Sequence, residues 1–397
     1  MITRFQVKNY KLLKDVDVPL TPIHVIVGQN DSGKTTFLEA LRAFCRTAED
    51  GVSSNQAFGD SSSLHELVSF GATEPVVNFL ADIDVKTKNI QFRETYELKL
   101  RIPSPPQALV IVLNEGLSSG QVRFSAGPRS TTGVSTRKQL GPDNPAREDL
   151  EGIADALLPV NLYLFDPRAM ASPAAYDANR KFRMDENGFG LSTLLDDILG
   201  FDAKRFLDLS SEFSEYFPEF QRIRLETVEL APRTFARGNH SESQGGHGKE
   251  VVLESSIGES IRARQASDGV LLFLGFLALL YSPKAPRILL IEEPERGVYP
   301  KRLAEIIGIL KRLVEPTPGR VTPQIILTTH SPYLLSFFQP EEVTLMSRRG
   351  DHAIARPLRN APHIHERMGE GGFYLGELWY NLEEAELFGD AEVAGVD

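Results

Sequence analysis

Apolar and polar residues alternate near the start of the chain, which is the pattern of half-buried β-strands. The alternation covers Ile2–Val7 and Leu13–Leu20, so these two segments are predicted to form a hairpin. A β-branched run at Ile23–Val27 predicts the next strand. Short alternating runs between Val76 and Ile102 predict further antiparallel strands. The N-terminal part of the chain is therefore expected to be rich in β-structure.

Apolar periodicity changes farther along the chain. Leu157–Phe165 predicts another strand, and Ser192–Phe217 has helical periodicity that is interrupted near Gly200. The run Val270–Leu280 is apolar enough for a buried core helix. Stretches rich in Gly, Ser, Asp or other polar residues are expected to be loops, with mobile tips in the second of them. These stretches are residues 49–64, Glu115–Asp149 and Arg233–Lys249.

Bulk properties limit the classes of protein to consider. A chain of 397 residues exceeds one ordinary hydrophobic core, so about two or three domains are expected. Apolar residues make up 41% and charged residues 24%, as in globular proteins rather than disordered chains. The 43 basic and 54 acidic residues give a net charge of −11, which provides no global attraction to nucleic acid or to anionic membranes. Any contact with DNA would need a local patch.

Other features favour a cytoplasmic location. The apolar run Val270–Tyr281 is too short to span a bilayer, and Met1–Tyr10 has the pattern of a strand rather than of a signal peptide. The single cysteine, Cys45, excludes an internal disulfide and favours a reducing compartment. We therefore expect no membrane partner.

A phosphate-binding loop follows the strand at Ile23–Val27. Residues 28–36 read GQNDSGKTT, with glycine at both ends of the loop, then lysine and a hydroxyl residue. This arrangement turns backbone N–H groups towards phosphates, directs the lysine at the β/γ oxygens and presents a hydroxyl to Mg²⁺. Apolar residues at helical spacing follow, so the loop opens a helix whose N-terminus favours an anion. A nucleoside triphosphate ligand is predicted, and the loop residues expected to contact it are Gly28, Asn30, Ser32, Gly33, Lys34, Thr35 and Thr36.

Two later apolar runs end in chemically active residues. Ile288–Ile291 is followed by Glu292 and Glu293, as expected for a buried parallel strand that delivers carboxylates at its C-terminal end. One carboxylate can lie near the Mg²⁺ shell while the other polarises an attacking water. Ile325–Thr329 is a second such strand and ends at His330, which is placed to donate a hydrogen bond to a γ-phosphate. On its own, an acidic pair after an apolar run is common at protein surfaces. A single histidine at a strand end is likewise more often structural than catalytic.

The turn Ser267-Asp268-Gly269 opens the apolar helix. It presents backbone N–H groups to an anion, although by itself it is only a helix N-cap.

The order of these motifs resembles that of the soluble ABC-type ATPases of the OLD, RecF and SMC-like group, in particular stand-alone ATPases of genome-maintenance and phage-defence loci. The resemblance covers about residues 1–45 and 255–345. It implies a P-loop α/β fold of ABC type with a mixed central sheet flanked by helices, an antiparallel β subdomain and a helical insertion. The ATPase domain is then expected to comprise residues 1–110 and 250–397, with an inserted β/helical lobe at 111–249.

The resemblance also implies roles for individual residues. Lys34 and Thr35 would bind phosphate and Mg²⁺, Glu292 would take the Walker B role at the metal, and Glu293 would be the catalytic base. His330 would be the switch histidine. Ser267 and Gly269 would reach across a head-to-tail homodimer to the partner's ATP, which gives two composite sites per dimer. The chain differs from many relatives in having glutamate at 292 rather than aspartate.

Several functions remain to be distinguished. The segment between the loop and Ser267 is too short for long coiled-coil arms, one cysteine cannot form a zinc hook, and the C-terminal segment lacks the carboxylate cluster of a nuclease. The leading hypothesis is an Mg²⁺-dependent ATPase whose ATP-driven dimer closure is a switch for DNA or for a separately encoded effector such as a nuclease. The alternatives are a nucleotide-binding subunit of a membrane transporter and a nucleotide-gated scaffold with negligible turnover.

Overall fold

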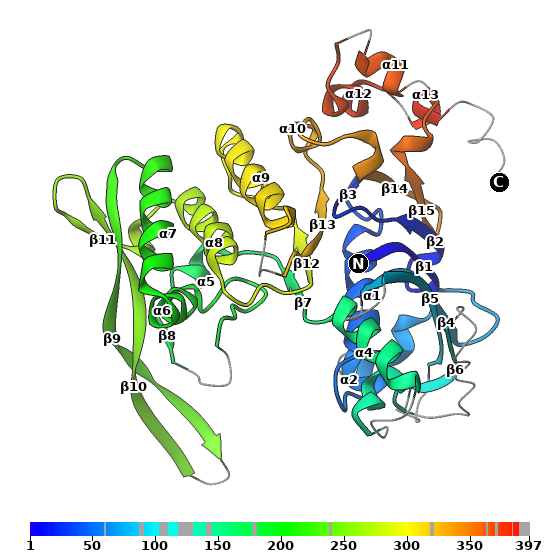
Figure 1. Ribbon diagram of the computed structural model, residues 1–397, viewed down its shortest axis with the longest axis horizontal. Helices are drawn as coiled ribbons and strands as arrows, with labels where there is room; N and C mark the ends of the chain where they lie inside the picture. The colour runs from blue at the N-terminus through cyan, green and yellow to red at the C-terminus, as the bar shows by residue number, and fades with distance from the viewer. Residues whose placement is uncertain are drawn as a thin grey trace. The chain divides into compact units, whose positions relative to one another are not determined.

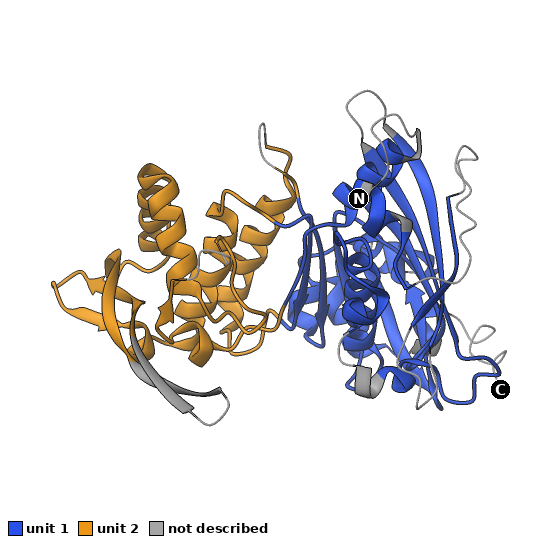
Figure 2. Cartoon of the chain, turned by 90° about the horizontal axis from the view of Figure 1, so that it is seen from below, with its two compact units in different colours: residues 1–162, 286–293, 323–397 blue, residues 163–285, 294–322 orange. Residues whose placement is uncertain are grey.

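The chain forms two compact units (Figure 2). Unit 1 contains residues 1–162, 286–293 and 323–397, and unit 2 contains residues 163–285 and 294–322. The predicted domain boundaries, at 110/111 and 249/250, divide the chain differently and stay a prediction. The computed structural model describes residues 1–58, 61–86, 91–102, 110–117, 130–139, 145–176, 181–237, 240–317, 321–362, 364–369, 372–382 and 384–388.

One layer of unit 1 is a five-stranded antiparallel sheet with the order β2-β1-β4-β5-β6 (Figure 1). Alternate side chains of β1 are buried, among them Phe5 and Val7, because one face of the sheet covers the core. The predicted hairpin and the strands between Val76 and Ile102 are confirmed. The strands are β1 (Ile2–Tyr10), β2 (Leu13–Pro19), β4 (Val76–Lys86), β5 (Gln91–Arg101) and β6 (Ile111–Leu117).

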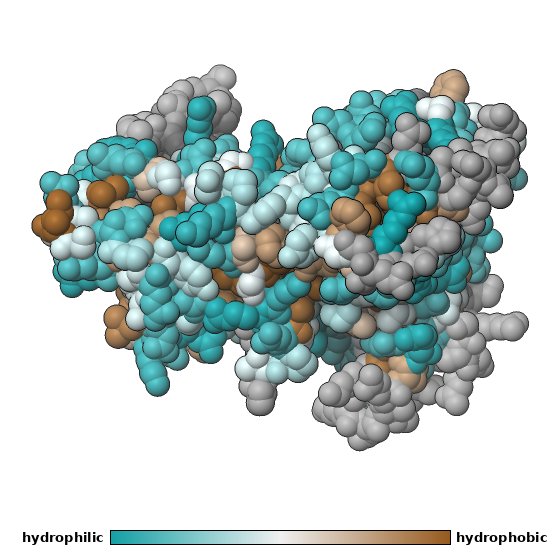
Figure 3. Space-filling view, turned by 90° about the horizontal axis from the view of Figure 1, so that it is seen from above, coloured by the Kyte–Doolittle hydropathy of each residue, from teal (hydrophilic) through white to brown (hydrophobic). Residues whose placement is uncertain are grey.

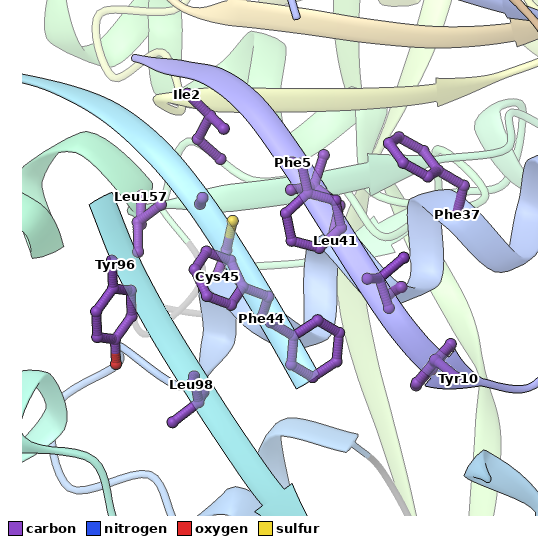
Figure 4. Packing of buried hydrophobic residues seen from close by; sticks show 14 of the residues in the cluster. Ile2, Phe5, Tyr10, Phe37, Leu41, Phe44, Cys45, Tyr96, Leu98 and Leu157 are labelled. Carbon is purple, nitrogen blue, oxygen red and sulfur yellow. The ribbon is translucent and has the colours of Figure 1, made fainter. Parts of the chain in front are cut away.

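Helix α1 (Lys34–Arg46) packs its apolar face on this sheet. The ring centroids of Phe37 and Phe44 lie 5.7 and 5.4 Å from that of Phe5 in β1, and the Phe44 ring lies 5.5 Å from Tyr96 in β5 (Figure 4). The same buried cluster includes Ile326 of the second sheet. Packing of α1 against both sheets therefore fixes the position of its N-terminus, where the phosphate-binding loop ends.

The second sheet of unit 1 has six strands in the order β15-β14-β3-β13-β12-β7. Strands β14, β3, β13 and β12 are parallel, and β15 is antiparallel to β14. β3 and β13 are buried along their whole length, as expected for strands covered on both faces. All the predicted strands of this sheet are confirmed. The bounds are β3 (Ile23–Val27), β7 (Val160–Tyr163), β12 (Ile288–Glu292), β13 (Gln324–Thr329), β14 (Val343–Arg349) and β15 (His352–Pro357).

Short helices complete unit 1. Helix α4 (Pro145–Leu157) packs on β4, and α12 (Leu375–Asn381) packs on α10 (Pro332–Leu335). The other helices are α2 (Ser54–Phe58), η1 (Ser61–Leu67), α3 (Gly133–Thr136), η2 (Arg137–Gln139), η5 (Pro340–Glu342), η6 (Leu358–Asn360), α11 (Ile364–Gly369) and α13 (Glu384–Phe388).

Unit 2 is built around α8 (Asp268–Tyr281), in which residues 270–280 are all buried, so the predicted core helix is confirmed. The ring of Phe273 lies 5.2 Å from that of Phe217, and the Arg302 guanidinium lies 4.2 Å above the Phe217 ring. The other elements are α5 (Pro167–Met170), β8 (Ala174–Ala175), α6 (Leu191–Phe201), α7 (Ala203–Tyr216), β9 (Phe220–Arg237), β10 (His240–Ser255), β11 (Ser260–Arg262), η4 (Ala263–Gln265) and α9 (Pro300–Val314).

The helix interruption predicted near Gly200 is confirmed, at Asp202. Asp202 lies in extended backbone between α6 and α7 and accepts hydrogen bonds from the N–H groups of Lys204 and Arg205. An N-cap of this kind begins a new helix, so the chain changes direction there.

The prediction of a loop over Arg233–Lys249 is wrong, because most of this segment is paired in β9 and β10 with a register that runs from Phe220↔Ser255 to Arg237↔His240. The sequence of this segment is rich in polar residues and glycine, so it lacks the apolar alternation that identifies half-buried strands. Residues 49–64 likewise contain α2 and the start of η1. Glu115–Asp149 contains α3, η2 and the first turn of α4, and its residues 118–129 and 140–144 lie outside the described ranges.

A buried histidine makes the second sheet sensitive to pH. The side chain of His24 in β3 is fully buried, with Nε2 3.0 Å from Thr344 Oγ1 and Nδ1 3.2 Å from Thr21 Oγ1. Burial, aided by the charge of Arg359, lowers the pKa of His24 to about 3. The folded chain therefore holds this imidazole neutral, whereas the unfolded chain protonates it below a pKa of about 6.5.

We predict that His24 makes the free energy of unfolding fall as pH decreases from about 6.5 towards 3, because the unfolded state binds a proton that the folded state excludes. The slope from this residue is up to about 1.4 kcal/mol per pH unit. Urea unfolding at several pH values in this window should give a shallower slope for His24→Asn than for the unsubstituted chain. His65→Gln, at an exposed histidine, is the control. Equal slopes for His24→Asn and the unsubstituted chain would contradict the assignment.

Candidate nucleotide-binding site

Both glycines of the phosphate-binding loop are required by geometry. A Cβ atom on Gly28 would lie 2.1 Å from the backbone oxygen of Met346 in β14, so only glycine fits between β3 and β14. Gly33 has φ 97°, and a Cβ atom there would lie 2.9 Å from Ala353 Cβ. Sequence alone explains glycine here by phosphate approach, and the structure adds that the neighbouring strands also demand it.

The start of α1 is arranged for an anion. Gly33 is the N-cap and supplies no side-chain cap, and the first turn carries no acidic residue. The N–H groups of this turn therefore remain available to phosphate oxygens. Lys34 is only 7% exposed, and its Nζ donates to the backbone oxygens of Gly28 (2.8 Å) and Gln29 (2.7 Å). These bonds hold the ammonium group over the loop, where the sequence predicts phosphate.

Glu292 and Thr35 meet at the end of β12. Their side chains are hydrogen-bonded, although the two residues lie far apart in sequence. Burial raises the pKa of Glu292, and the neighbouring carboxylates of Glu39 and Glu293 act in the same direction. Glu292 Oε1 is buried and has no hydrogen-bond partner among the described residues. A carboxylate with a spare buried oxygen beside a hydroxyl is a donor set that suits Mg²⁺, so the residues present fit the implied metal.

Glu293 lies in a backbone conformation that is costly for a non-glycine residue, with φ 45°. Its N–H donates to the backbone oxygen of Thr328 (3.0 Å), which holds the turn, and its Oε1 lies 3.1 Å from Nδ1 of His330. The His330 side chain is 51% exposed and that of Glu293 is 28% exposed. Both side chains are thus held at the strand ends and remain open to solvent.

The parallel register brings these groups to one edge. Glu292 pairs with Thr328 across β12 and β13, and Thr329 pairs with Val27 across β13 and β3. The loop, the two glutamates and His330 therefore leave the sheet at the same level, at its carboxyl edge.

The Ser-Asp-Gly turn belongs to unit 2, whereas the loop, the two glutamates and His330 belong to unit 1. Ser267 occupies the N-cap position of α8 and its side chain is exposed, but it makes no capping hydrogen bond. A Cβ atom on Gly269 would meet nothing within 4 Å. The prediction that this turn forms the N-cap of the apolar helix is confirmed.

The described residues include neither a metal-binding cluster of this kind of side chain nor a membrane-spanning helix. Among described residues, no group of at least three His, Cys, Asp or Glu side chains could hold a metal ion by itself. No helix in the described ranges is long and apolar enough to cross a membrane. Hydrophilic residues cover most of the described surface on the face drawn in Figure 3.

A glycine-flanked loop between a buried parallel strand and a helix, with a carboxylate at the end of a second strand, defines a P-loop ATPase of the α/β class. The predicted fold class is therefore confirmed. The chain belongs to the family described as "AAA domain, putative AbiEii toxin, Type IV TA system", whose model matches residues 23–336.

Individual relatives share shorter or more distant similarity. The chain is 54% identical over 41 residues to an OLD nuclease of Thermus scotoductus, a match that covers 10% of this chain and only 8% of the nuclease. Among solved structures, an Smc head bound to the C-terminal winged-helix domain of ScpA is 14% identical with a TM-score of 0.49. The match covers 89% of this chain and 96% of the Smc chain. The SMC head domain of Thermotoga maritima is 11% identical with a TM-score of 0.44, and the match covers 90% of this chain and 98% of that domain.

We predict that Gly28→Ala lowers the free energy of unfolding by about 2 kcal/mol, because the new methyl group must displace the backbone of β14. Gly308→Ala is the matched control, since a Cβ atom there meets nothing within 4 Å, and helical alanine should leave stability equal or higher. Chemical denaturation measures both. An unchanged stability of Gly28→Ala would show that β14 does not restrict the loop.

Proposed function

We propose that this protein is a cytoplasmic, Mg²⁺-dependent ATPase that forms a homodimer when it binds ATP. Dimer closure would act as a switch for DNA-related work or for a separately encoded effector such as a nuclease, in genome maintenance or phage defence. The observation that carries this proposal is the meeting of the Glu293–His330 pair and the Glu292–Thr35 pair at the edge of the sheet that bears the phosphate-binding loop.

The loop residues hold the triphosphate in this proposal. Lys34 exchanges its two backbone acceptors for β/γ oxygens, and the N–H groups at the start of α1 complete the cradle. Thr35 and Glu292 would hold Mg²⁺. The bound ion would neutralise charge on the transferred phosphoryl group. Burial raises the pKa of Glu292, and a bound divalent cation would stabilise its ionised form.

Glu293 is the general base. Its turn conformation directs the carboxylate out of β12, and His330 fixes the carboxylate from the neighbouring strand. Glu293 would accept a proton from the attacking water while His330 would donate a hydrogen bond to the γ-phosphate. Both residues of the Glu293–His330 contact therefore have a role in hydrolysis. Loss of either side chain should lower the turnover rate more than the affinity for ATP.

The Ser-Asp-Gly turn would act on the partner's nucleotide. Support comes from the exposed side chain of Ser267, which makes no capping hydrogen bond, and from its position at the N-terminus of α8, where the helix dipole favours an anion. In a head-to-tail dimer each copy would supply the loop of one site and the turn of the other. Nucleotide binding would thus favour the closed dimer, and hydrolysis would reset it.

We predict that Glu293→Gln lowers the ATP turnover rate at least about a hundredfold while it preserves ATP binding, because the amide cannot accept the proton. Phosphate release and equilibrium binding measure the two effects. The matched control is Glu341→Gln, since Glu341 lies in a similar but remote pair, 3.3 Å from Nε2 of His365. Full turnover by the Glu293→Gln variant would remove this glutamate from the mechanism.

We further predict that two inactive variants recover ATPase activity when they are mixed. Lys34→Ala removes the loop function and Ser267→Arg removes the turn function, so a mixed dimer would retain one intact composite site. A one-to-one mixture should recover about a quarter of the unsubstituted rate, because about half the dimers are mixed and each has one working site. If the mixture shows only the sum of the two separate rates, Ser267 does not act on the partner's nucleotide.

A further inference from the structure

A cavity opens beside the phosphate-binding loop within unit 1. Its volume is about 610 Å³, within the range of small-molecule sites. One wall consists of loop residues Gln29, Asn30 and Ser32, and another is the end of β14 at residues 345–348. The opposite side is formed by Trp379 and its neighbours in the C-terminal segment. A ligand held by the polar loop would therefore also lie beside an aromatic wall.

Packing fixes the aromatic wall. A Cβ atom on Gly376 would lie 1.8 Å from the backbone oxygen of Pro332, so α12 lies directly against α10 and only glycine permits this approach. Leu378 is buried on the same helix, and farther along the chain Phe388 lies beneath the Arg356 guanidinium, 5.2 Å from ring centroid to Cζ. The segment is thus anchored on both sides of Trp379, which holds the indole ring at the cavity.

The loop side of the cavity carries a buried hydroxyl group, that of Ser32. Ser32 is only 2% exposed, and its Oγ has no hydrogen-bond partner among the described residues. A buried hydroxyl without a partner costs free energy, so its presence at a cavity wall points to a ligand that bonds to it. The cavity therefore combines a hydroxyl and the exposed side chains of the loop on one wall with an aromatic ring on another.

We propose that this cavity holds the nucleobase end of the nucleotide, with the base stacked on Trp379 while the phosphates occupy the loop. This inference rests on the proposed function, because it places the remaining part of the same ligand. An aromatic ring beside a phosphate site binds any base through its π-face, so the stacking adds affinity without base selectivity. The C-terminal segment is then part of the nucleotide site.

Two ligands distinguish the contribution of the base to binding from that of the phosphates. ATP presents both, whereas inorganic tripolyphosphate presents only phosphates. In the presence of Mg²⁺, titration calorimetry should show that Trp379→Ala weakens ATP binding about tenfold and leaves tripolyphosphate binding unchanged, whereas Trp379→Phe keeps most of the ATP affinity. The control is Phe373→Ala, at an exposed aromatic residue of the same segment that does not line the cavity.

The only tryptophan of the chain also provides a direct signal. Its emission should change on addition of ATP or GTP and stay constant on addition of tripolyphosphate. ATP affinity that is unaffected by Trp379→Ala, or an equal loss for both ligands, would overturn the subsite while leaving the proposed ATPase intact. Failure of the unsubstituted chain to bind either ligand would instead overturn the proposed function, and the subsite with it.

Discussion

The parallel register of β3, β13 and β12 is the constraint on which the rest of the site depends. It places Val27, Thr329 and Glu292 at the same edge, so the loop, the carboxylates and His330 leave the sheet together. The strands can run parallel and buried because α1 and the five-stranded sheet supply one apolar wall for them. A shift of one residue in any pair would exchange the faces of the strand and separate Glu292 from Thr35.

Two unfavourable local conformations lie at this same edge. Asp31 (φ 61°) and Glu293 (φ 45°) have positive φ, and Glu292 is a half-buried residue whose carboxyl group has a raised pKa. Each left-handed non-glycine residue costs about 1–3 kcal/mol, which the packed sheet must offset. The fully buried strands provide that rigidity, and the strained turns aim their side chains where regular strand geometry would not. Stability is thus concentrated beneath the site and strain within it.

Much of the site was predictable from sequence, because its residues follow continuous apolar runs. Glu292, Glu293 and His330 end such runs, and the loop has a fixed spacing between a strand and a helix. The strand pairing over Arg233–Lys249 was not predictable, since the polar, glycine-rich sequence of this segment has no strand period. Nor was the cavity at Trp379, because it depends on the approach of Gly376 to Pro332 and on contacts between distant segments. Local pattern therefore predicted which residues lie at this edge, and long-range packing determined what surrounds them.

The central claim is that the carboxyl edge of this sheet binds Mg²⁺ and ATP and is completed by a second copy of the chain. Sedimentation velocity of the Glu293→Gln variant, with and without saturating Mg²⁺ and ATP, tests it most directly. The account predicts a shift from single subunits to dimers only when nucleotide is present. Single subunits at saturating nucleotide would contradict it.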